Sequence, residues 1–312
     1  MYALRVKKEE AEKKIREAKE RGIFDSSRKV VREGEFVFIP VKRKVRGAVE
    51  KELPERKRVE SLREKYGIGS YDIVGDIAIV FIPPDLWEKR FEIGKHLMKI
   101  HRKLRAVYAE AGATEGEFRI KPLELVAGEG SETVHRENGL RFKLDVTKVY
   151  FSPRQATERK RIVKYVREGD VVAVFFAGIC PIPVYISKFS KAKKIYAIEK
   201  NPWACRYARE NIEMNRCANI ELICGNVREE YRKLPPCDLV IMPLPKGSLD
   251  FLEEAREVLK AGGRVVIYVA SREEELDEKV KKIGSYFEIE EVRREKEIAP
   301  REYRFVVVGV RR

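Results

Sequence analysis

The chain has 312 residues, with 66 Lys and Arg against 51 Asp and Glu, so its formal net charge is +15. The hydrophobic content of 44% is enough for a buried core, and no apolar run reaches the roughly 20 residues of a membrane-spanning helix. The N-terminus has no hydrophobic core of a secretory signal. Composition therefore excludes a disordered or membrane-embedded protein, and we expect a cytoplasmic one.

Positive charge is densest near the N-terminus. Residues 1–66 contain 21 Lys and Arg against 13 Asp and Glu. A basic surface of this kind favours a polyanion such as nucleic acid as the partner. The abundant Lys, Arg and Glu of a heat-adapted protein would explain the many charges, but not the excess of one sign.

The cysteines of this chain indicate buried thiols in a reducing compartment. None of them forms a C-x-x-C pair, and no histidine lies near them in the sequence. We therefore expect no metal site. The five positions are Cys180, Cys205, Cys217, Cys224 and Cys237.

Residues 1–66 predict a small N-terminal domain. Residues 3–22 have Glu and Lys three or four positions apart, which predicts a helix that ends at Gly22. An apolar strand follows at 36–41. The charged stretch after it predicts a partly helical linker that runs to the glycines at 67 and 69.

Residues 67–150 predict a second small domain of α+β type. Strand material at 71–83 precedes an amphipathic helix at 86–104. Short strands are predicted at 118–128, 131–139 and 140–151. The last two should form a hairpin, because Asn138-Gly139 accepts the positive φ angles of a tight turn.

Residues 151–312 alternate between helix and strand, which predicts a doubly wound α/β domain with a mainly parallel, seven-stranded sheet. The last two strands lack a helix between them and should form an antiparallel hairpin at the sheet edge. This is the layout of class I methyltransferases that use S-adenosylmethionine. The predicted strands are 171–176, 194–199, 220–225, 238–244, 264–270, 288–298 and 303–310, and the helices are 155–167, 183–190, 202–215, 248–260 and 272–285.

A cofactor turn is predicted where the first parallel strand ends, at Phe176-Ala177-Gly178. The second strand ends in Glu199, where a carboxylate can accept both ribose hydroxyls of an adenosine. Asn226 follows the third strand and can reach an adenine edge. A dinucleotide needs several glycines to cradle its phosphates, and this turn has one, followed by two prolines. S-adenosylmethionine needs no such cradle and fits better, with a strand end that binds nothing as the alternative.

The turn after the fourth parallel strand narrows the choice of methyl acceptor. Met242-Pro243-Leu244-Pro245 lacks the polar first residue and the aromatic last residue that suit an exocyclic amine. Cys237 precedes the strand rather than following it, so we interpret it as a core residue and not as a nucleophile. A ring nitrogen with a removable proton remains, and such a reaction requires a general base.

Glu158 is the candidate for that base. It is spaced by four from Ile162 and by eight from Val166, so it continues an apolar helix face and should be partly buried. Arg154 and Arg161 lie one turn to either side. An inward carboxylate between arginines is either a structural ion pair or a tuned base, and the spacing alone leaves both open.

Four stretches, taken together, resemble the archaeal tRNA (guanine-37-N1)-methyltransferases, a family with relatives in the wybutosine pathway. They are YFSPRQATER, FFAGICPIP, AIEKNPWACRYARENIEMN and APREY, and the resemblance covers essentially the whole chain. It implies a mobile N-terminal module that grips the outer corner of tRNA, a small α+β domain, and a methyltransferase domain that reaches the anticodon loop. We expect a monomer with S-adenosylmethionine as cofactor, and boundaries near 66 and 150.

The resemblance also implies roles for individual residues. Glu158 would take the proton from N1 of guanine 37, and Arg119 would stabilise negative charge on O6. A surface arginine on a strand is the alternative for Arg119. Together with the strand-end argument, the resemblance gives the candidate cofactor contacts Phe176, Ala177, Gly178, Glu199, Asn201, Asn226 and Pro243, and the candidate tRNA contacts Tyr150, Arg154, Arg159 and Pro245.

The chain departs from the family pattern in two regions. The family often has Asp, Gly and Asp where this chain has Val174, Cys180 and Asn226. Its Asn-Leu-Pro turn is Pro-Leu-Pro here, so Pro243 removes a side-chain hydrogen bond near the guanine. The form of this turn resembles a branch whose members in some cases also methylate the tricyclic wyosine precursor, 4-demethylwyosine. A second activity on that precursor therefore stays open.

Two other functions stay open as well. A wybutosine-pathway aminocarboxypropyltransferase uses the same donor but a different carbon, although the retained Glu158 favours methylation. A non-catalytic tRNA-binding protein would use Glu158 only as a structural residue.

Overall fold

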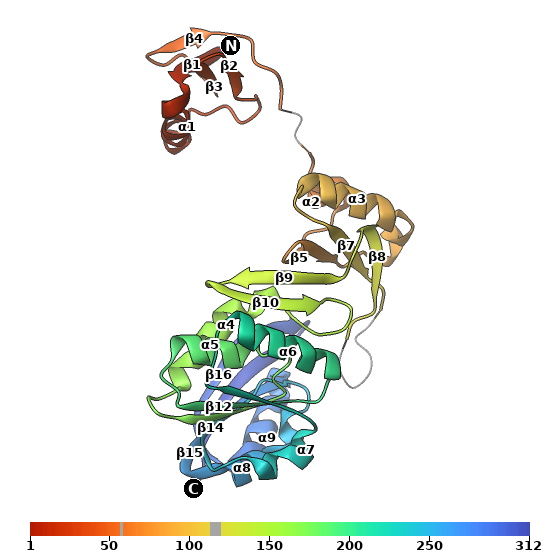
Figure 1. The fold of residues 1–312 in the computed structure, drawn as a ribbon. Coiled ribbons are helices and arrows are strands. Elements are labelled where there is room, and N and C mark those ends of the chain that lie inside the picture. The colour runs from red at the N-terminus through yellow and green to blue at the C-terminus, as the bar shows by residue number, and fades with distance from the viewer. Residues whose placement is uncertain (57–58, 113–119) are drawn as a thin grey trace. The chain divides into compact units, whose positions relative to one another are not determined.

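The computed structural model describes residues 1–56, 59–112 and 120–312 (Figure 1). The chain divides into two compact units, Met1–Lys65 and Tyr66–Arg312. Among the described residues, none of the helices has the length and apolar character needed to cross a membrane.

The first unit contains a four-stranded antiparallel sheet and helix α1. The strands pair in the order β2-β3-β1-β4. Helix α1 (Ala11–Glu20) buries Ala11 and Ala18, and Gly22 follows it with φ 66°, so the predicted helix end is confirmed. The strands are β1 (Tyr2–Lys7), β2 (Val31–Glu33), β3 (Phe36–Val41) and β4 (Ala48–Glu50).

The helix predicted for 3–22 is wrong in its first part, because Tyr2–Lys7 forms β1. Residues of β1 alternate in exposure, with Ala3 fully buried. The strand pairs along its whole length with β3 and also with β4, so it lies inside the sheet. Those long-range backbone hydrogen bonds override the local charge spacing that favoured a helix.

The second unit begins with a four-stranded sheet in the order β5-β6-β7-β8. Gly75, with φ 59°, turns the chain between β5 and β6, so the strand predicted over 71–83 is a hairpin. Helix α3 (Arg90–Ile100) connects the parallel pair β6 and β7, and β7 was not predicted. Helix α2 (Leu62–Tyr66) precedes the sheet, and its strands are β5 (Tyr71–Val74), β6 (Ile77–Val80), β7 (Ala106–Glu110) and β8 (Leu123–Gly128).

Strands β9 (Glu132–Glu137) and β10 (Leu140–Asp145) form a separate two-stranded ribbon. Asn138 and Gly139 have φ 48° and 80° in the turn, which confirms the predicted hairpin.

Two amides of helix α6 (Pro202–Met214) and its C-cap hold this ribbon. Asn211 accepts from the N–H of Lys143 at 2.7 Å and donates to its carbonyl at 3.1 Å. Asn215 does the same for Arg141, at 3.0 and 2.6 Å. The two side chains therefore occupy the free edge of β10 much as a neighbouring strand would.

The rest of the second unit is a seven-stranded sheet in the order β13-β12-β11-β14-β15-β17-β16. Five strands are parallel and β17 is antiparallel to both neighbours, so the predicted class I methyltransferase layout is confirmed. The strands are β11 (Val171–Phe175), β12 (Lys194–Glu199), β13 (Ile220–Cys224), β14 (Cys237–Met242), β15 (Leu259–Ser271), β16 (Glu288–Ala299) and β17 (Glu302–Val310).

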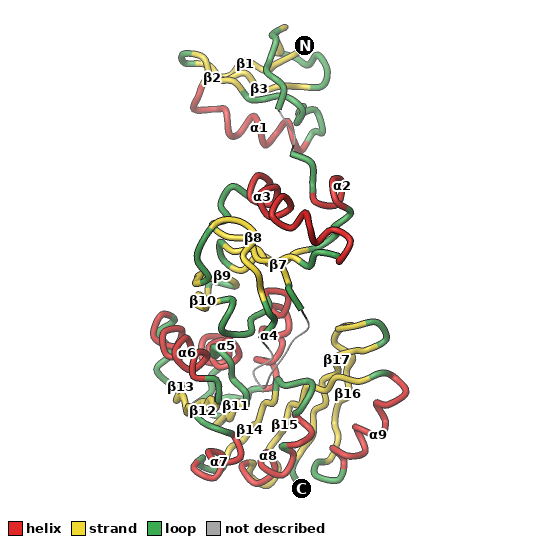
Figure 2. Tube along the Cα trace, turned by 90° about the vertical axis from the view of Figure 1, so that its right-hand side faces the viewer, coloured by secondary structure: helices red, strands yellow, loops and turns green. Residues whose placement is uncertain are grey.

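Helices cover both faces of this sheet (Figure 2). One buried core contains residues of α4, α5 and α6, and the other contains residues of α7, α8 and α9. The helices are α4 (Ala156–Ile162), α5 (Pro181–Phe189), α7 (Val227–Glu230), α8 (Leu252–Val258) and α9 (Glu273–Gly284).

Helix α4 is shorter than predicted. It ends at Ile162, a single 3-10 turn follows, and Val166 is extended with ψ 124°. Val166 therefore does not share a helical face with Glu158, although Ile162 does and is buried.

Candidate active site

The carboxyl ends of the parallel strands carry the predicted cofactor residues. The turn after β11 passes through left-handed conformations at Phe176, Gly178 and Cys180, with φ between 56° and 62°. The N–H of Ala177 donates to the carbonyl of Ile198 in β12 at 3.0 Å, which ties the turn to the second strand. Two non-glycine residues in this conformation are strained, and such strain is typical of ligand-binding turns.

Glu199 closes the same turn from β12. Its carboxylate accepts the N–H of Gly178 at 2.7 Å and the N–H of Asn201 at 2.8 Å. Burial raises the pKa of Glu199, and these backbone hydrogen bonds oppose part of that rise. A carboxylate has about four acceptor positions, and the backbone of Lys200 also donates to it, so one position remains for a hydroxyl of a ribose.

The two predicted asparagines both cap helices. Asn201 accepts the N–H of Trp203 at 3.0 Å at the start of α6, and its amide donates to the carbonyl of Lys148 at 3.3 Å. Its side chain is thus committed to structure, and its backbone N–H orients Glu199. Asn226 accepts the N–H of Arg228 at 3.1 Å at the start of α7.

An aromatic wall borders the cofactor turn. The ring of Phe176 meets that of Phe251 edge-on, with centroids 4.8 Å apart, and the guanidinium of Arg228 lies 4.7 Å from the Phe251 ring.

The turn after β14 is fixed by backbone contacts. The Ser248 hydroxyl donates to the carbonyls of Met242 and Leu244 at 3.1 and 2.8 Å, and Ala270 donates to the carbonyl of Pro245 at 2.9 Å. Pro243 and Pro245 are therefore held at the carboxyl ends of β14 and β15.

Glu158 is buried, with 5% of its surface exposed. Its Oε1 accepts hydrogen bonds from the Tyr268 hydroxyl at 2.9 Å and from Arg293 Nη2 at 2.7 Å. Its Oε2 has a longer contact of 3.5 Å with Arg161 Nη1. The predicted inward direction of Glu158 is confirmed. Of the two predicted arginine neighbours, Arg161 contacts it.

Tyr268 and Arg293 were not predicted. They flank Val306 in one row across β15, β17 and β16, because all three residues are directly paired in register. Glu158 reaches this row from α4. Tyr268 looks like another apolar strand residue in the sequence, and Arg293 looks like another charge of an edge strand. The register of the terminal hairpin brings them together.

Arg159 does not have the exposed position expected of an RNA contact. It is 3% exposed and makes a bidentate ion pair with Glu137 of β9, from Nε to Oε1 at 2.8 Å and from Nη2 to Oε2 at 2.7 Å. It also donates to the carbonyl of Ser152 at 3.1 Å. This buried pair fastens α4 to the ribbon, so Arg159 helps to place the neighbouring Glu158.

Tyr150 and Arg154 do have accessible side chains. Tyr150 is 58% exposed, and its hydroxyl accepts from Gln155 at 3.0 Å. Arg154 is exposed and forms an ion pair with Asp72 of β5 at 2.5 Å. Arg119, the predicted partner of O6, lies outside the described residues.

Cys237 starts β14 and is fully buried, as predicted for a core residue. Burial raises the pKa of its thiol to about 12, so it is not a nucleophile at neutral pH.

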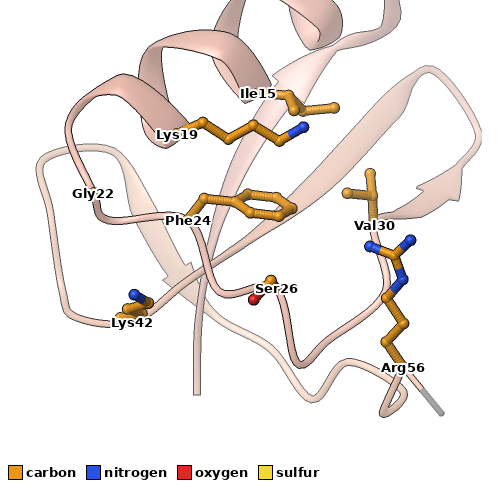
Figure 3. A pocket seen from close by; sticks show the side chains of 8 residues that line it. All are labelled: Ile15, Lys19, Gly22, Phe24, Ser26, Val30, Lys42 and Arg56. Atoms are coloured by element: carbon orange, nitrogen blue, oxygen red, sulfur yellow. The ribbon is translucent and has the colours of Figure 1, made fainter. Parts of the chain in front are cut away.

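The first unit has a hollow of its own, of about 600 Å³ (Figure 3). Phe24 lies at its centre, with the amine of Lys19 at 5.5 Å from the ring centroid. Cations surround an apolar floor, and the lining residues are Ile15, Lys19, Gly22, Phe24, Ser26, Val30, Lys42 and Arg56.

The strand order defines the fold of a class I methyltransferase. The turn at Gly178, which Glu199 closes at the carboxyl ends of β11 and β12, lies where this fold binds its cofactor. The family model of the TRM5/TYW2 methyltransferase domain matches residues 133–294. The TYW2 N-terminal domain matches 45–131, and the tRNA methyltransferase 5 N-terminal domain matches 3–50. The chain belongs to the TRM5/TYW2 methyltransferase family.

Named relatives cover different shares of the chain. The tRNA (guanine(37)-N(1))-methyltransferase Trm5b of Pyrococcus abyssi is 39% identical and covers 98% of this chain and 97% of its own. The tRNA (guanine(37)-N(1))/4-demethylwyosine(37)-methyltransferase Taw22 of Nanoarchaeum equitans is 32% identical over 69% of this chain and 88% of its own. Among solved structures, the complex of aTrm5 with tRNALeu has a TM-score of 0.80, with 32% identity and full coverage of both chains.

Proposed function

We propose that the protein transfers a methyl group from S-adenosylmethionine to N1 of guanine 37 in tRNA. The observation that carries this proposal is Glu158, a buried carboxylate whose Oε1 is saturated by two donors while Oε2 is not. The 39% identity to a Trm5b methyltransferase supports the substrate.

Glu158 acts as the general base in this proposal. The N1 nitrogen of guanine carries a proton, so it becomes a good nucleophile only as that proton leaves. Oε2 of Glu158 receives the proton, and negative charge then spreads from N1 towards O6 of the base. Arg119, assigned by resemblance alone, stabilises the charge on O6.

The cofactor-binding residues are those around the β11 turn. S-adenosylmethionine supplies an electrophilic methyl group when bound. Glu199 accepts from the ribose with its spare acceptor position, and Asn226 reaches the adenine edge. The turn at Phe176–Gly178 and the fixed loop at Pro243 complete the walls of the site.

The tRNA contacts in this proposal come from both units. Tyr150, as an exposed aromatic ring, can stack on a base of the anticodon loop, and Arg154 can pair with a phosphate. Pro245 borders the target base. In the first unit, the cationic hollow around Phe24 suits the outer corner of tRNA. A monomeric state and a cytoplasmic location stay predictions.

Pro243 favours a second activity on 4-demethylwyosine. A proline offers no side-chain hydrogen bond to the base, so the wall there selects by shape alone. Incubation of guanine-bearing and precursor-bearing tRNA with labelled donor, followed by mass spectrometry of nucleosides, would show which bases gain a methyl group. A mass gain of an aminocarboxypropyl group would instead support the transferase alternative.

Replacing Glu158 by Gln tests the general base. The amide keeps the size of the side chain but cannot take the proton, so we expect the single-turnover methylation rate to fall by about 10²- to 10⁴-fold. Affinity for tRNA should stay within about twofold. Glu257→Gln is a matched control, because Glu257 also accepts from a tyrosine, Tyr231, at 2.8 Å. An unchanged rate in Glu158→Gln would leave Glu158 with a structural role only.

A further inference from the structure

We infer that Tyr268 and Arg293 are positioning residues for methyl transfer, which hold Oε1 of Glu158 so that Oε2 faces the proton. This inference rests on the proposed function, because it needs Glu158 to act as the base. Tyr268 lies on strand β15 and Arg293 on strand β16, whereas Glu158 lies on helix α4.

The contacts distinguish the two oxygens of Glu158. Oε1 accepts at 2.9 Å from a phenol and at 2.7 Å from a guanidinium. Within residues 1–56, 59–112 and 120–312, the polar contact of Oε2 is with Arg161, at the outer limit of a hydrogen bond at 3.5 Å. Two short, charge-assisted bonds to one oxygen fix the rotation of the carboxylate, and they leave Oε2 as the better acceptor.

The row across the sheet makes this arrangement rigid. Tyr268, Val306 and Arg293 are in register on three hydrogen-bonded strands, and Val306 is fully buried between the two donors. Their spacing is thus set by backbone pairing, and a site on paired strands holds geometry better than a site on a loop.

The nitrogens of Arg293 differ in how well they are bonded. Its buried Nε and Nη1 make no well-aligned hydrogen bond within the described part of the chain, although Nε lies 3.3 Å from Glu291 Oε1. Buried donors without partners reduce stability. The short, well-formed hydrogen bond of this guanidinium is the one that Nη2 donates to Oε1 of Glu158 at 2.7 Å.

The charged neighbours keep both donors in their donating forms. Burial, reinforced by the negative charge of Glu158, raises the pKa of Tyr268 well above its ordinary value, so the phenol stays protonated. Burial opposes the charge of Arg293, but the hydrogen bond to Glu158, the negative charge of Glu158 and a hydrogen bond with Tyr165 together outweigh it and raise the pKa of Arg293. Tyr165 and Glu291 lie beside Arg293, and Arg304 lies 5.4 Å from the Tyr268 ring.

The first test replaces Tyr268 by Phe, which removes the donor and keeps the ring. We expect the single-turnover rate of methyl transfer to tRNA to fall about tenfold or more, with the Kd for tRNA and for S-adenosylmethionine within about twofold. Arg293→Lys should retain more of this rate than Arg293→Gln, because the ammonium can still bond Oε1. Tyr231→Phe is the control, since it deletes a tyrosine–glutamate bond of 2.8 Å in the other core.

The second test repeats Tyr268→Phe in the Glu158→Gln background. If Tyr268 acts through Glu158, it should cause no further loss there. A rate in Tyr268→Phe equal to the parent would overturn the inference while leaving Glu158 as the base. A loss shared by Tyr231→Phe, or a loss in tRNA affinity instead of rate, would overturn it as well, because either marks a merely structural role.

Discussion

The carboxylates of Glu199 and Glu158 accept hydrogen bonds from different kinds of donor, and the difference suits different tasks. Glu199 accepts backbone N–H groups of Gly178 and Asn201, which orient it without adding a positive charge. Glu158 accepts from a guanidinium on β16 and a phenol on β15, the two strands that flank β17. The first arrangement suits hydrogen bonding to neutral hydroxyls, and the second suits a group that must keep one oxygen free for a proton.

The pH dependence of cofactor binding follows from Glu199. Burial raises its pKa above the ordinary value of 4.5 in spite of the backbone bonds. As pH falls through that raised value the carboxyl gains a proton and loses an acceptor position. We therefore expect affinity for S-adenosylmethionine to weaken on acidification, starting at a higher pH than for an exposed glutamate.

Calorimetric titration between neutral and mildly acidic pH checks this expectation. Glu199→Gln should bind weakly at every pH, with a flat profile. A parent profile as flat as that of the variant would contradict the assignment of Glu199 to the ribose.

Local patterns were enough to find Glu199 and Glu158. Glu199 comes 21 residues after Gly178, at the end of a strand, and Glu158 continues a helical apolar face. Tyr268 and Arg293 could not be found in this way, because their meeting depends on the register of three strands distant in sequence. The burial of Arg159 could not be predicted from a local pattern either, because its ion-pair partner, Glu137, lies in the ribbon, 22 residues earlier.

At the scale of elements, helix α6 joins the cofactor turn to the β9–β10 ribbon. Its N-cap, Asn201, lies beside Glu199. In its last turn Asn211, and after it the C-cap Asn215, pair through their amides with the backbone of β10. The ribbon is held on its other side as well, since Arg159 of α4 pairs with Glu137 of β9. The ribbon therefore links two helices that carry or border the active site.

Replacing Asn211 by Ala should destabilise the second unit. The change leaves the partly buried N–H and carbonyl of Lys143 without their partner, which costs about 2 kcal/mol of unfolding free energy. Denaturant unfolding measures the loss. Glu213→Ala, at an exposed position of the same helix, should change stability by less than about 0.5 kcal/mol. Equal stability of the two variants would show that the amide pairing contributes little.

Elements with strong local signals were predicted well. All seven strands of the large sheet were found, because buried parallel strands are short apolar runs between amphipathic helices. Strand β1 was taken for part of a helix and β7 was missed, since both depend on pairing with distant strands. Helix α4 ended a turn early for a similar reason, as residues 163–165 tighten into a 3-10 turn.

For the whole molecule, the division into Met1–Lys65 and Tyr66–Arg312 separates the basic module from the described site residues. The proposed catalytic and cofactor-binding residues that the structure describes all belong to the second unit. Most of the sequence's charge excess, by contrast, comes from the first fifth of the chain. Binding of the outer corner of tRNA and methyl transfer are thus proposed for different units.

Removal of residues 1–65 should weaken tRNA binding and make the affinity less dependent on salt, because fewer phosphate contacts release fewer counterions. Methylation of a saturating anticodon stem-loop should change little. In the full chain, Lys19→Ala should weaken binding to whole tRNA, whereas Lys14→Ala should not, because Lys14 is held by Glu17 at 2.8 Å. Equal salt slopes with and without the module would contradict its proposed role.

The amide of Asn211 on α6 also matters for deamidation, the slow hydrolysis of an asparagine side chain. Deamidation of Asn211 would replace its donating NH₂ with a negatively charged oxygen opposite the carbonyl of Lys143, and the ribbon would then be repelled. Asn211 is 0% exposed and lies within a helix, so hydrolysis must wait for that helix to open. The working lifetime of the enzyme on prolonged heating is therefore tied to how often α6 unwinds.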